Sequence, residues 1–358
     1  MLYTIWVLVF FISVLIMIQY SKSKTIMSLC YFAQFVLCLI LHGWSSGAYD
    51  VNIAISRYIY PSRFSSFTEI GFSFLVDIGH NLGLDYRMFY LILAAFELSV
   101  LFVFVKRNCK KYPIAMGLFL FYPSVVLFQY VRNFIAFPFI VLAIDVLLNK
   151  QKNYVIKYII LILIGTLFHF SSVFFLLFLP ITILERKKAV LLTIGSFLFL
   201  LLVSNISFLY NILFYFMGPD KADMVSSTAN ADGNFGRFFS IVYYTFSFYA
   251  MYFLLHHVYH TRTKGDEFFF KINLLTMLCA PLTTKFAVGF ARIPDFFLIF
   301  NYIYYVNCIS EMKSQKKRMI CYTILFILLL GMFVLCFRNE EYRKLVLYPF
   351  FEQNELFH

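Results

Sequence analysis

The chain has 358 residues, of which 62% are hydrophobic and only 13% are charged. Apolar runs of about 20 residues recur along it, and each is long enough to cross a bilayer. No polar segment exceeds about 30 residues, which excludes a separate soluble domain of ordinary size. The composition therefore predicts an all-α, polytopic integral membrane protein with a single membrane-embedded domain over residues 1–358.

Apolar runs and the polar residues between them predict twelve transmembrane helices. The sixth and seventh are short and meet at His169, so together they predict a tight helical hairpin. The N-terminal run lacks the basic start and small-residue cleavage site of a signal peptide, and we expect it to be the first crossing. The predicted helices span residues 2–20, 25–43, 86–105, 113–130, 133–149, 154–168, 170–184, 189–209, 238–258, 268–286, 291–309 and 319–337.

Basic residues in alternate loops predict the orientation of these helices. Short cytoplasmic loops are enriched in Lys and Arg. Six alternate loops contain 18 Lys and Arg residues against four acids, so much of the net charge of +12 reports orientation and not nucleic-acid binding. Both chain ends are then expected outside the cytoplasm. The six loops lie at residues 21–24, 106–111, 150–157, 185–188, 262–267 and 310–318.

Three longer segments are expected on the outer face, at residues 45–85, 210–237 and 338–358. The first contains FTEIGFSFLVDIGHNLGL, in which apolar and acidic residues interleave as in an amphipathic helix on the membrane surface. The second contains GPDKADMVSSTANADGNFG, which is rich in turn-forming residues.

Cationic residues on the outer face need an explanation, because the positive-inside rule disfavours them there. An Arg toward the centre of a membrane helix costs about 2.5–3.5 kcal/mol on insertion scales, so it calls for a partner, and a bound anion is one such partner. Two alternatives stay open: Arg132 can extend to the lipid headgroups, and Arg292 can pair with Asp295 one turn on. The candidate anion ligands are Arg132, Arg292, Arg237, Arg57 and Lys285.

Three further residues are candidates for a general base on the outer face: His169, Asp50 and Glu69. His169 is the first choice, since imidazole exchanges protons near neutral pH, although a lone histidine is often structural. Glu97 lies inside an apolar run without an obvious partner, and Asp145 lies near Lys150 and Lys152.

Several chemistries lack their sequence signatures. The seven cysteines fall mostly in apolar runs without CxxC or Cys/His ligand spacing, so neither a disulfide framework nor a zinc site is predicted. DxD, Walker A, GxSxG and HExxH motifs are also missing, which argues against nucleotide-sugar, ATP, serine-hydrolase and zinc-protease chemistry. We therefore expect no metal and no cofactor.

Several short motifs, in order along the chain, resemble the Wzy polymerases of bacterial surface polysaccharides such as O-antigen and capsule, in particular their EpsG-like branch. VRNFIAFPFIVLAI is similar to the arginine-led helix of that family, LFHFSSVFFLL to its histidine hairpin, and SFTEIGFSFL to its acidic-Gly-Phe segment. Tyr348 and Pro349 match a Tyr-Pro pair beyond the last helix. The sequence departs from the family pattern at Val51, where a Tyr often follows the Asp, and at Asn133, where Gln is common.

The resemblance implies an integral membrane glycosyltransferase acting at the outer leaflet of the bacterial plasma membrane, which is the inner membrane in a Gram-negative cell. It would move a growing glycan from undecaprenyl pyrophosphate to a sugar hydroxyl of a lipid-linked repeat unit. Expected partners are undecaprenyl-pyrophosphate-linked oligosaccharides and membrane lipid, with a chain-length regulator and a flippase as candidate protein partners and no nucleic acid. The alternatives are an O-antigen-ligase-like transferase, a flippase or transporter of the same lipid-linked units, and an acyltransferase of surface sugars.

Overall fold

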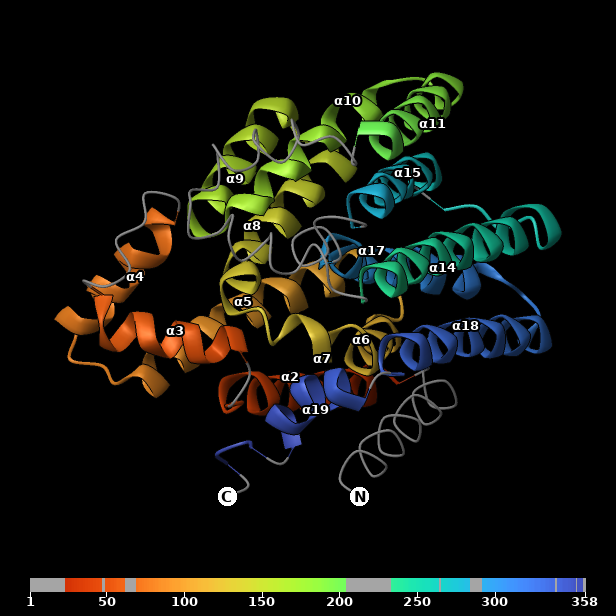
Figure 1. The fold of residues 1–358 in the computed structure, drawn as a ribbon. Coiled ribbons are helices and arrows are strands. Elements are labelled where there is room, and N and C mark those ends of the chain that lie inside the picture. Colours follow the sequence, from red (N-terminus) through yellow and green to blue (C-terminus); the bar gives the residue numbers. More distant parts are fainter. Residues whose placement is uncertain are drawn as a thin grey trace. The chain divides into compact units, whose positions relative to one another are not determined.

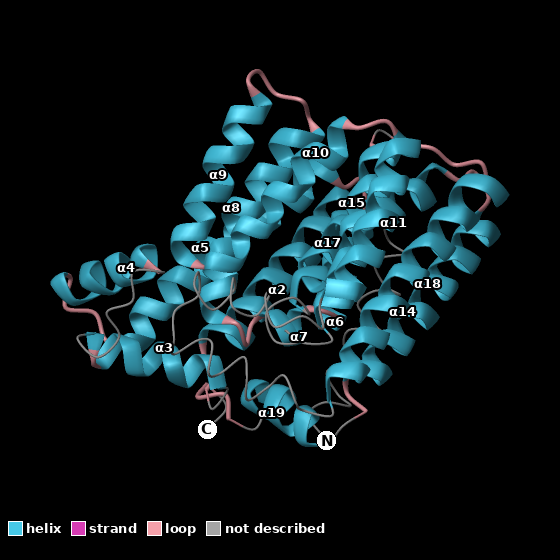
Figure 2. Ribbon diagram, turned by 45° about the horizontal axis from the view of Figure 1, so that its top comes forward, coloured by secondary structure: helices cyan, strands magenta, loops and turns pink. Residues whose placement is uncertain are grey.

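The structure, a computed structural model, describes residues 23–46, 49–61, 69–203, 233–263, 265–283, 292–338, 340–351 and 353–356. Within these ranges helices are the only regular secondary structure (Figures 1 and 2), which confirms the all-α prediction. The predicted first helix at 2–20, most of the turn-rich segment at 210–237 and Lys285 lie outside the described residues.

Five of the described helical stretches are long and apolar enough to cross a membrane. The number of twelve crossings stays a prediction, because several other apolar helices are shorter than a bilayer requires. The five stretches are α2 (Lys24–Gly43), α5 (Tyr86–Asn108), α8 (Val131–Leu148), the run Phe238–Val258 within α14 (Gly233–Phe253) and η3 (Leu254–Val258), and α18 (Gln315–Cys336).

The helices cluster into two compact units. Unit 1 comprises Met1–Leu176 and Phe337–His358, and unit 2 comprises Leu177–Cys336. In unit 1, α3 (Tyr49–Ile59) packs on α5 and α8, while α4 (Ile70–Asn81) packs on α9 (Tyr154–Phe168). A buried apolar core joins α3, α4, α5 and α8 through Val51, Ala54, Tyr58, Phe72, Val76, Phe89, Tyr90, Leu93, Val131 and Ile135.

Helices α8 and α9 form a hairpin that organises unit 1. The chain reverses over residues 149–153, where Lys150 and Asn153 adopt positive φ angles of 45° and 58°. Gly165 packs against α8, where an added Cβ would make an ordinary van der Waals contact of 3.5 Å with the Ala136 carbonyl oxygen. The start of α8 and the end of α9 therefore lie at the same end of the hairpin, opposite the connection that carries Lys150 and Lys152.

Three predicted boundaries need correction. The single helix expected at 113–130 is divided into α6 (Tyr112–Phe121) and α7 (Ser124–Leu127), because Pro123 has no backbone N–H to continue the helical hydrogen bonds. The helix expected from residue 133 begins at Val131, so Arg132 belongs to its first turn. The segment expected to be helical over 170–184 is a 3₁₀ helix, η2 (Phe170–Leu177), followed by the short α10 (Phe178–Ile183).

The segment at 45–85, which is predicted to be on the outer face, and the C-terminal segment both contain helices. The predicted amphipathic helix corresponds to α4, and a second helix, α3, precedes it. Near the C-terminus, α19 (Glu340–Phe351) packs on α2 and α7. The amide Nδ2 of Asn354 donates to the Ile40 carbonyl at 3.2 Å, and the backbone N–H of Glu355 donates to the Trp44 carbonyl at 3.0 Å. These bonds tie the C-terminal segment to the end of α2.

A neutral polar network joins three helices of unit 2: α14, α15 (Asp266–Thr283) and α17 (Arg292–Glu311). Asn301 Nδ2 donates to the Tyr244 hydroxyl at 2.7 Å and to Asn273 Oδ1 at 2.9 Å, and Asn273 Nδ2 donates to Asn301 Oδ1 at 2.8 Å. All three side chains are buried. Because the amides and the phenol satisfy one another, this network stabilises the packing without calling for a ligand.

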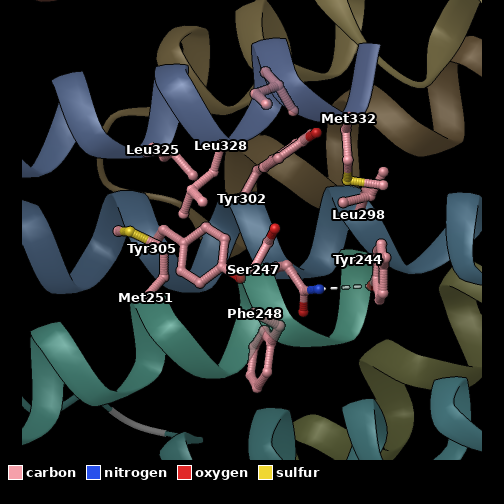
Figure 3. A pocket seen from close by; sticks show the side chains of 12 residues that line it. Tyr244, Ser247, Phe248, Met251, Leu298, Tyr302, Tyr305, Leu325, Leu328 and Met332 are labelled. Carbon is pink, nitrogen blue, oxygen red and sulfur yellow. Dashed lines mark hydrogen bonds between the residues drawn. The ribbon is translucent and has the colours of Figure 1, made fainter. Parts of the chain in front are cut away.

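A small pocket lies beside this network, between α14, α17 and α18 (Figure 3). It contains about 310 Å³ of empty space, part of which is open to the surroundings. Leu325, Leu328 and Met332 supply its α18 side, and Ser247 and Tyr305 reach toward it from α14 and α17. The lining is mostly apolar, as expected where helices pack in a membrane.

Candidate functional site

A fully buried carboxylate, Glu69, gathers three of the residues that the sequence analysis selected. Arg57 Nη1 donates to Glu69 Oε2 at 2.7 Å, and Arg132 Nη1 donates to the same oxygen at 2.6 Å. The other oxygen, Oε1, lies 3.4 Å from His169 Nδ1. We call Glu69, Arg57, Arg132 and His169 the Glu69 cluster. Residues separated by up to about a third of the chain thus meet at one point.

Each member of the cluster lies at a helix end, which explains why the four side chains meet. Arg57 is in the last turn of α3, and Glu69 directly precedes α4. Arg132 is in the first turn of α8. His169 follows the last residue of α9 in an extended conformation, with φ −151° and ψ 119°. The cluster therefore lies at the end of the α8–α9 hairpin that is opposite its basic connection.

Gly71 permits the close approach of α4 to α9. A Cβ at this position would lie 3.0 Å from the Leu167 carbonyl oxygen and 3.0 Å from atoms of the Phe168 ring. The backbone oxygen cannot move aside without moving α9, so a side chain here is disfavoured. This contact holds the start of α4, and Glu69 with it, next to His169.

Two guanidinium groups share the Glu69 carboxylate, and Asp50 is a second acid that acts on Arg57. Burial and the neighbouring charge of Arg132 lower the pKa of Arg57, while Glu69 and Asp50 oppose that shift. Arg57 still stays protonated at physiological pH. Asp50 is buried and precedes Arg57 by seven residues, two helical turns, on the same face of α3. A guanidinium group has five N–H donors, so each arginine can contact a further anion besides Glu69.

Three of the four side chains of the Glu69 cluster are partly exposed to solvent. The side chains of Arg57 and Arg132 are 12% and 14% exposed, and that of His169 is 18% exposed, whereas Glu69 is covered by the others. Charge-assisted hydrogen bonds are stronger in such surroundings than in open water. A charged group of a substrate could reach the guanidinium groups while most of the surrounding water is excluded.

A second contact braces the same end of the hairpin. Ser171 Oγ donates to Asn133 Oδ1 at 3.3 Å, which connects η2 to the first turn of α8. Asn133 is the position at which this sequence departs from the Gln that is common in the resembling family. The contact fixes the backbone beside both Arg132 and His169.

The remaining predicted site residues lie elsewhere in the chain. Arg292 begins α17, and Arg237 belongs to α14, so both are part of unit 2. Tyr348 is on α19 in unit 1 and is 39% exposed. The contacts that define the Glu69 cluster are all made within unit 1.

Sequence reasoning missed the partner of Glu97. His42 Nε2 lies 2.8 Å from Glu97 Oε2, and the Tyr90 hydroxyl lies 3.0 Å from His42 Nδ1. The rings of Phe128 and Phe134 pack against His42, and the acid and imidazole are both fully buried. A signal was available, because ionisable residues inside membrane helices usually pair with one another, and His42 is a lone histidine in an apolar run.

Two other expectations about charged residues change. Asp145 accepts hydrogen bonds at 3.0 Å from Asn108 Nδ2 and from Asn149 Nδ2, and Arg107 Nη2 lies 3.8 Å from Asp145 Oδ2. His256, whose partner the sequence analysis did not predict, has Nε2 3.6 Å from Asp266 Oδ2. In the part of the chain that the structure describes, no group of three or more His, Cys, Asp or Glu residues gathers as a metal site would require.

These observations define a class: a helical membrane protein with a buried, cation-rich cluster at the end of a helical hairpin. Comparison with protein families gives the particular group. A sequence model of the EpsG family matches residues 54–350, so the chain belongs to the EpsG family, a family of polysaccharide polymerase-like membrane proteins. The matched range contains all four members of the Glu69 cluster, and it confirms the resemblance drawn from the motifs. Nothing matches the chain among curated proteins or among solved structures.

Proposed function

We propose that this protein is a polysaccharide polymerase that extends a surface glycan on its lipid carrier. It transfers the growing glycan from undecaprenyl pyrophosphate to a hydroxyl of the non-reducing-end sugar in a lipid-linked repeat unit. The observation that carries the proposal is the Glu69 cluster, where Arg57 and Arg132 converge from two helices. Membership of the EpsG family supports the same class of reaction.

In this proposal the two arginines bind the pyrophosphate of the donor. A guanidinium group presents N–H donors in a planar fork that matches phosphate oxygens, and it keeps its charge at all relevant pH values. As the bond to the sugar breaks, negative charge grows on the departing pyrophosphate. Fixed cations nearby stabilise that charge more in the transition state than in the ground state, which is what accelerates transfer. This role needs no divalent metal.

His169 is the proposed general base. The acceptor hydroxyl oxygen forms a bond to the anomeric carbon of the donor glycan, and the bond from that carbon to the pyrophosphate oxygen breaks with its electron pair going to the oxygen. The hydroxyl proton passes to Nε2 of His169, because Nδ1 faces Glu69. The products are the extended lipid-linked glycan and undecaprenyl pyrophosphate. Glu69 then acts as a positioning residue that orients the imidazole ring.

The proposed site is on the extracytoplasmic face of the bacterial plasma membrane. The α8–α9 connection carries Lys150 and Lys152, and the positive-inside rule assigns such a loop to the cytoplasm. The Glu69 cluster is at the other end of that hairpin, where lipid-linked units would be presented. The proposed partners are these units and membrane lipid, with a chain-length regulator and a flippase as candidate protein partners.

Other residues are proposed as ligands of the glycan or the pyrophosphate. Asp50 supports the charge of Arg57 in the cluster and is a second candidate for a base. Cationic residues outside the cluster would contribute further contacts to the donor, and a phenol would contribute one to a sugar. These are Arg292, Arg237, Lys285 and Tyr348.

Chain length in cells tests the proposal. A strain lacking the gene should accumulate single repeat units and lose long chains, and the wild-type gene should restore them. Arg132→Ala should fail to restore long chains at normal abundance in the membrane. Arg262→Ala is the matched control, because Arg262 is exposed and lies in the basic loop at residues 262–267 that is assigned to the cytoplasm.

Other outcomes contradict the proposal in distinguishable ways. Loss of all anchored glycan, single units included, indicates a ligase. Units trapped on the cytoplasmic leaflet indicate a flippase. Unchanged chain length with altered acetyl content indicates an acyltransferase.

A further inference from the structure

The Glu69 cluster, in the state that the structure describes, already contains an anion. Both guanidinium groups direct Nη1 to the same carboxylate oxygen of Glu69, at 2.7 Å and 2.6 Å. A donor pyrophosphate that binds these two arginines must therefore compete with Glu69. The pyrophosphate is favoured in this competition. A pyrophosphate diester carries about two negative charges and several acceptor oxygens, whereas the carboxylate has one charge and two oxygens.

We infer that Glu69 is an internal anion that the pyrophosphate of the donor displaces, and that this displacement prepares His169 to act as base. The inference rests on the proposed function and adds a coupling between donor binding and catalysis. In the resting state Glu69 holds Arg57 and Arg132 together. In the donor complex the arginines turn to phosphate oxygens, and the carboxylate turns fully to His169.

The geometry around Glu69 favours such a change. The carboxylate makes two short hydrogen bonds through Oε2, while Oε1 and His169 Nδ1 are 3.4 Å apart, longer than a good N–H···O bond. The Glu69 side chain makes no capping hydrogen bond to the start of α4. A rotation of the side chain therefore breaks no capping hydrogen bond of α4, and a movement of about half an ångström gives a full hydrogen bond to the imidazole.

Charge explains why the movement would prepare the base. A carboxylate clamped by two guanidinium groups has most of its negative charge compensated, so it stabilises a protonated imidazole weakly. When the guanidinium groups bind phosphate instead, Glu69 regains its full effect on His169. The imidazole then takes up the hydroxyl proton more readily, as a carboxylate-oriented histidine does in other group-transfer sites.

The consequence is a base that becomes active only with a donor in place. Without donor, His169 would not promote reactions of water or of an acceptor that has arrived alone. The same cluster would thus bind the leaving group and report its presence. A purely structural ion pair between Glu69 and the arginines would give neither property.

Opposite effects of one variant on probe binding and on turnover would distinguish a displaceable internal anion from a purely structural ion pair. The probe is geranylgeranyl pyrophosphate, titrated into the purified full-length protein in lipid nanodiscs. Glu69→Gln removes the internal anion, so the probe should bind about tenfold more tightly, equivalent to ~1.4 kcal/mol. The same variant should extend lipid-linked repeat units at least about tenfold more slowly, because His169 loses its carboxylate.

Two further variants control the measurement. Asp77→Asn removes the same charge from the exposed side of α4 and should change neither quantity. Glu69→Ser places a favoured N-cap residue before α4, so it should preserve the helix if the Gln variant folds poorly. It should also bind the probe more tightly than wild type. Both neutral variants must agree for the inference to stand.

The results separate failure of this inference from failure of the proposed function. If neutral variants of Glu69 bind the probe as wild type does, or more weakly, while Arg132→Ala abolishes binding, the displacement idea is wrong and the pyrophosphate site stands. If Arg132→Ala binds the probe and extends chains normally, the pyrophosphate site itself is wrong. Tighter binding that occurs equally in Asp77→Asn reports only net charge and overturns the inference.

Discussion

Unit 1 contains two glutamates that each face a histidine, and their surroundings differ. Glu97 and His42 meet at 2.8 Å inside the apolar core, with Tyr90 as the third member. Glu69 and His169 meet at 3.4 Å where helix ends converge. The first pair is completely covered, whereas the His169 side chain is 18% exposed. The same two side-chain types thus occur in a closed setting and in a partly open one.

The difference in charge is more informative than the difference in exposure. In the Glu97 group, one acid, one imidazole and one phenol satisfy most of each other's hydrogen-bonding needs, and no cation is added. In the Glu69 cluster, two guanidinium groups meet one carboxylate oxygen, and Asp50 acts on Arg57 as a second acid. A fully buried group without arginines clamps helices together, while partly exposed guanidinium groups are suited to an anionic ligand. Four experiments test that distinction.

Replacing each of the two histidines with Gln should give the largest difference in the rate of chain extension. His169→Gln should lower the rate of glycan extension per molecule by about 10²–10⁴-fold, the usual contribution of a general base, with little change in abundance. His42→Gln should instead lower abundance and leave the rate per folded molecule near wild type. The measurement is chain extension in nanodiscs, normalised to folded protein. Equal losses of rate in the two variants would remove the distinction between the pairs.

Replacing both His42 and Glu97 should destabilise the protein less than replacing His42 alone. His42→Leu leaves the Glu97 carboxyl buried without its partner and should cost about 3 kcal/mol of unfolding free energy. His42→Leu combined with Glu97→Leu should recover most of that loss, because apolar side chains then fill the same space. Thermal unfolding in detergent checks both variants. A double variant that is no more stable than the single one would indicate a role beyond clamping α2 to α5.

Gly71 offers a test of how precisely Glu69 must be placed. Gly71→Ala forces the added Cβ against the Leu167 carbonyl and the Phe168 ring, both 3.0 Å away, so α4 must shift. We expect chain extension to fall about tenfold, since displacements of an ångström or less already disturb catalytic geometry. Gly195→Ala is the control, because a Cβ there meets nothing within 4 Å. Similar losses in both variants would point to a general effect on helix packing.

The smallest effect on chain extension is expected from removing the hydrogen bond between Ser171 and Asn133. Ser171→Ala removes the 3.3 Å hydrogen bond to Asn133 but no charge. Chain extension should fall about two- to threefold, in line with a net contribution of about 0.5 kcal/mol for one partly exposed hydrogen bond. Ser171→Thr keeps the hydroxyl and should retain activity. A loss as large as that of His169→Gln would show that Ser171 contacts the substrate directly.

Local sequence patterns predicted much of the helical structure and all four members of the Glu69 cluster. Apolar runs placed α2, α5, α9 and α18 within a few residues of their observed bounds. The arginine-led helix, the histidine hairpin and the acidic-Gly-Phe segment supplied Arg132, His169 and Glu69, and Arg57 was selected among the outer-face cations. The proline at position 123 was an available signal for dividing the helix. The 3₁₀ form of η2 had no such signal, because an apolar run does not distinguish a 3₁₀ helix from an α-helix.

The sequence by itself determined that the protein is helical and fit for a membrane, because hydrocarbon leaves helices as the way for such apolar runs to satisfy their backbone hydrogen bonds. It also determined which charged residues were out of place. Only the tertiary structure decided which of them meet. Partners such as Glu69 with Arg132, or His42 with Glu97, lie on different helices, and the spacing of residues along one helix carries no record of the neighbour that packing brings beside it.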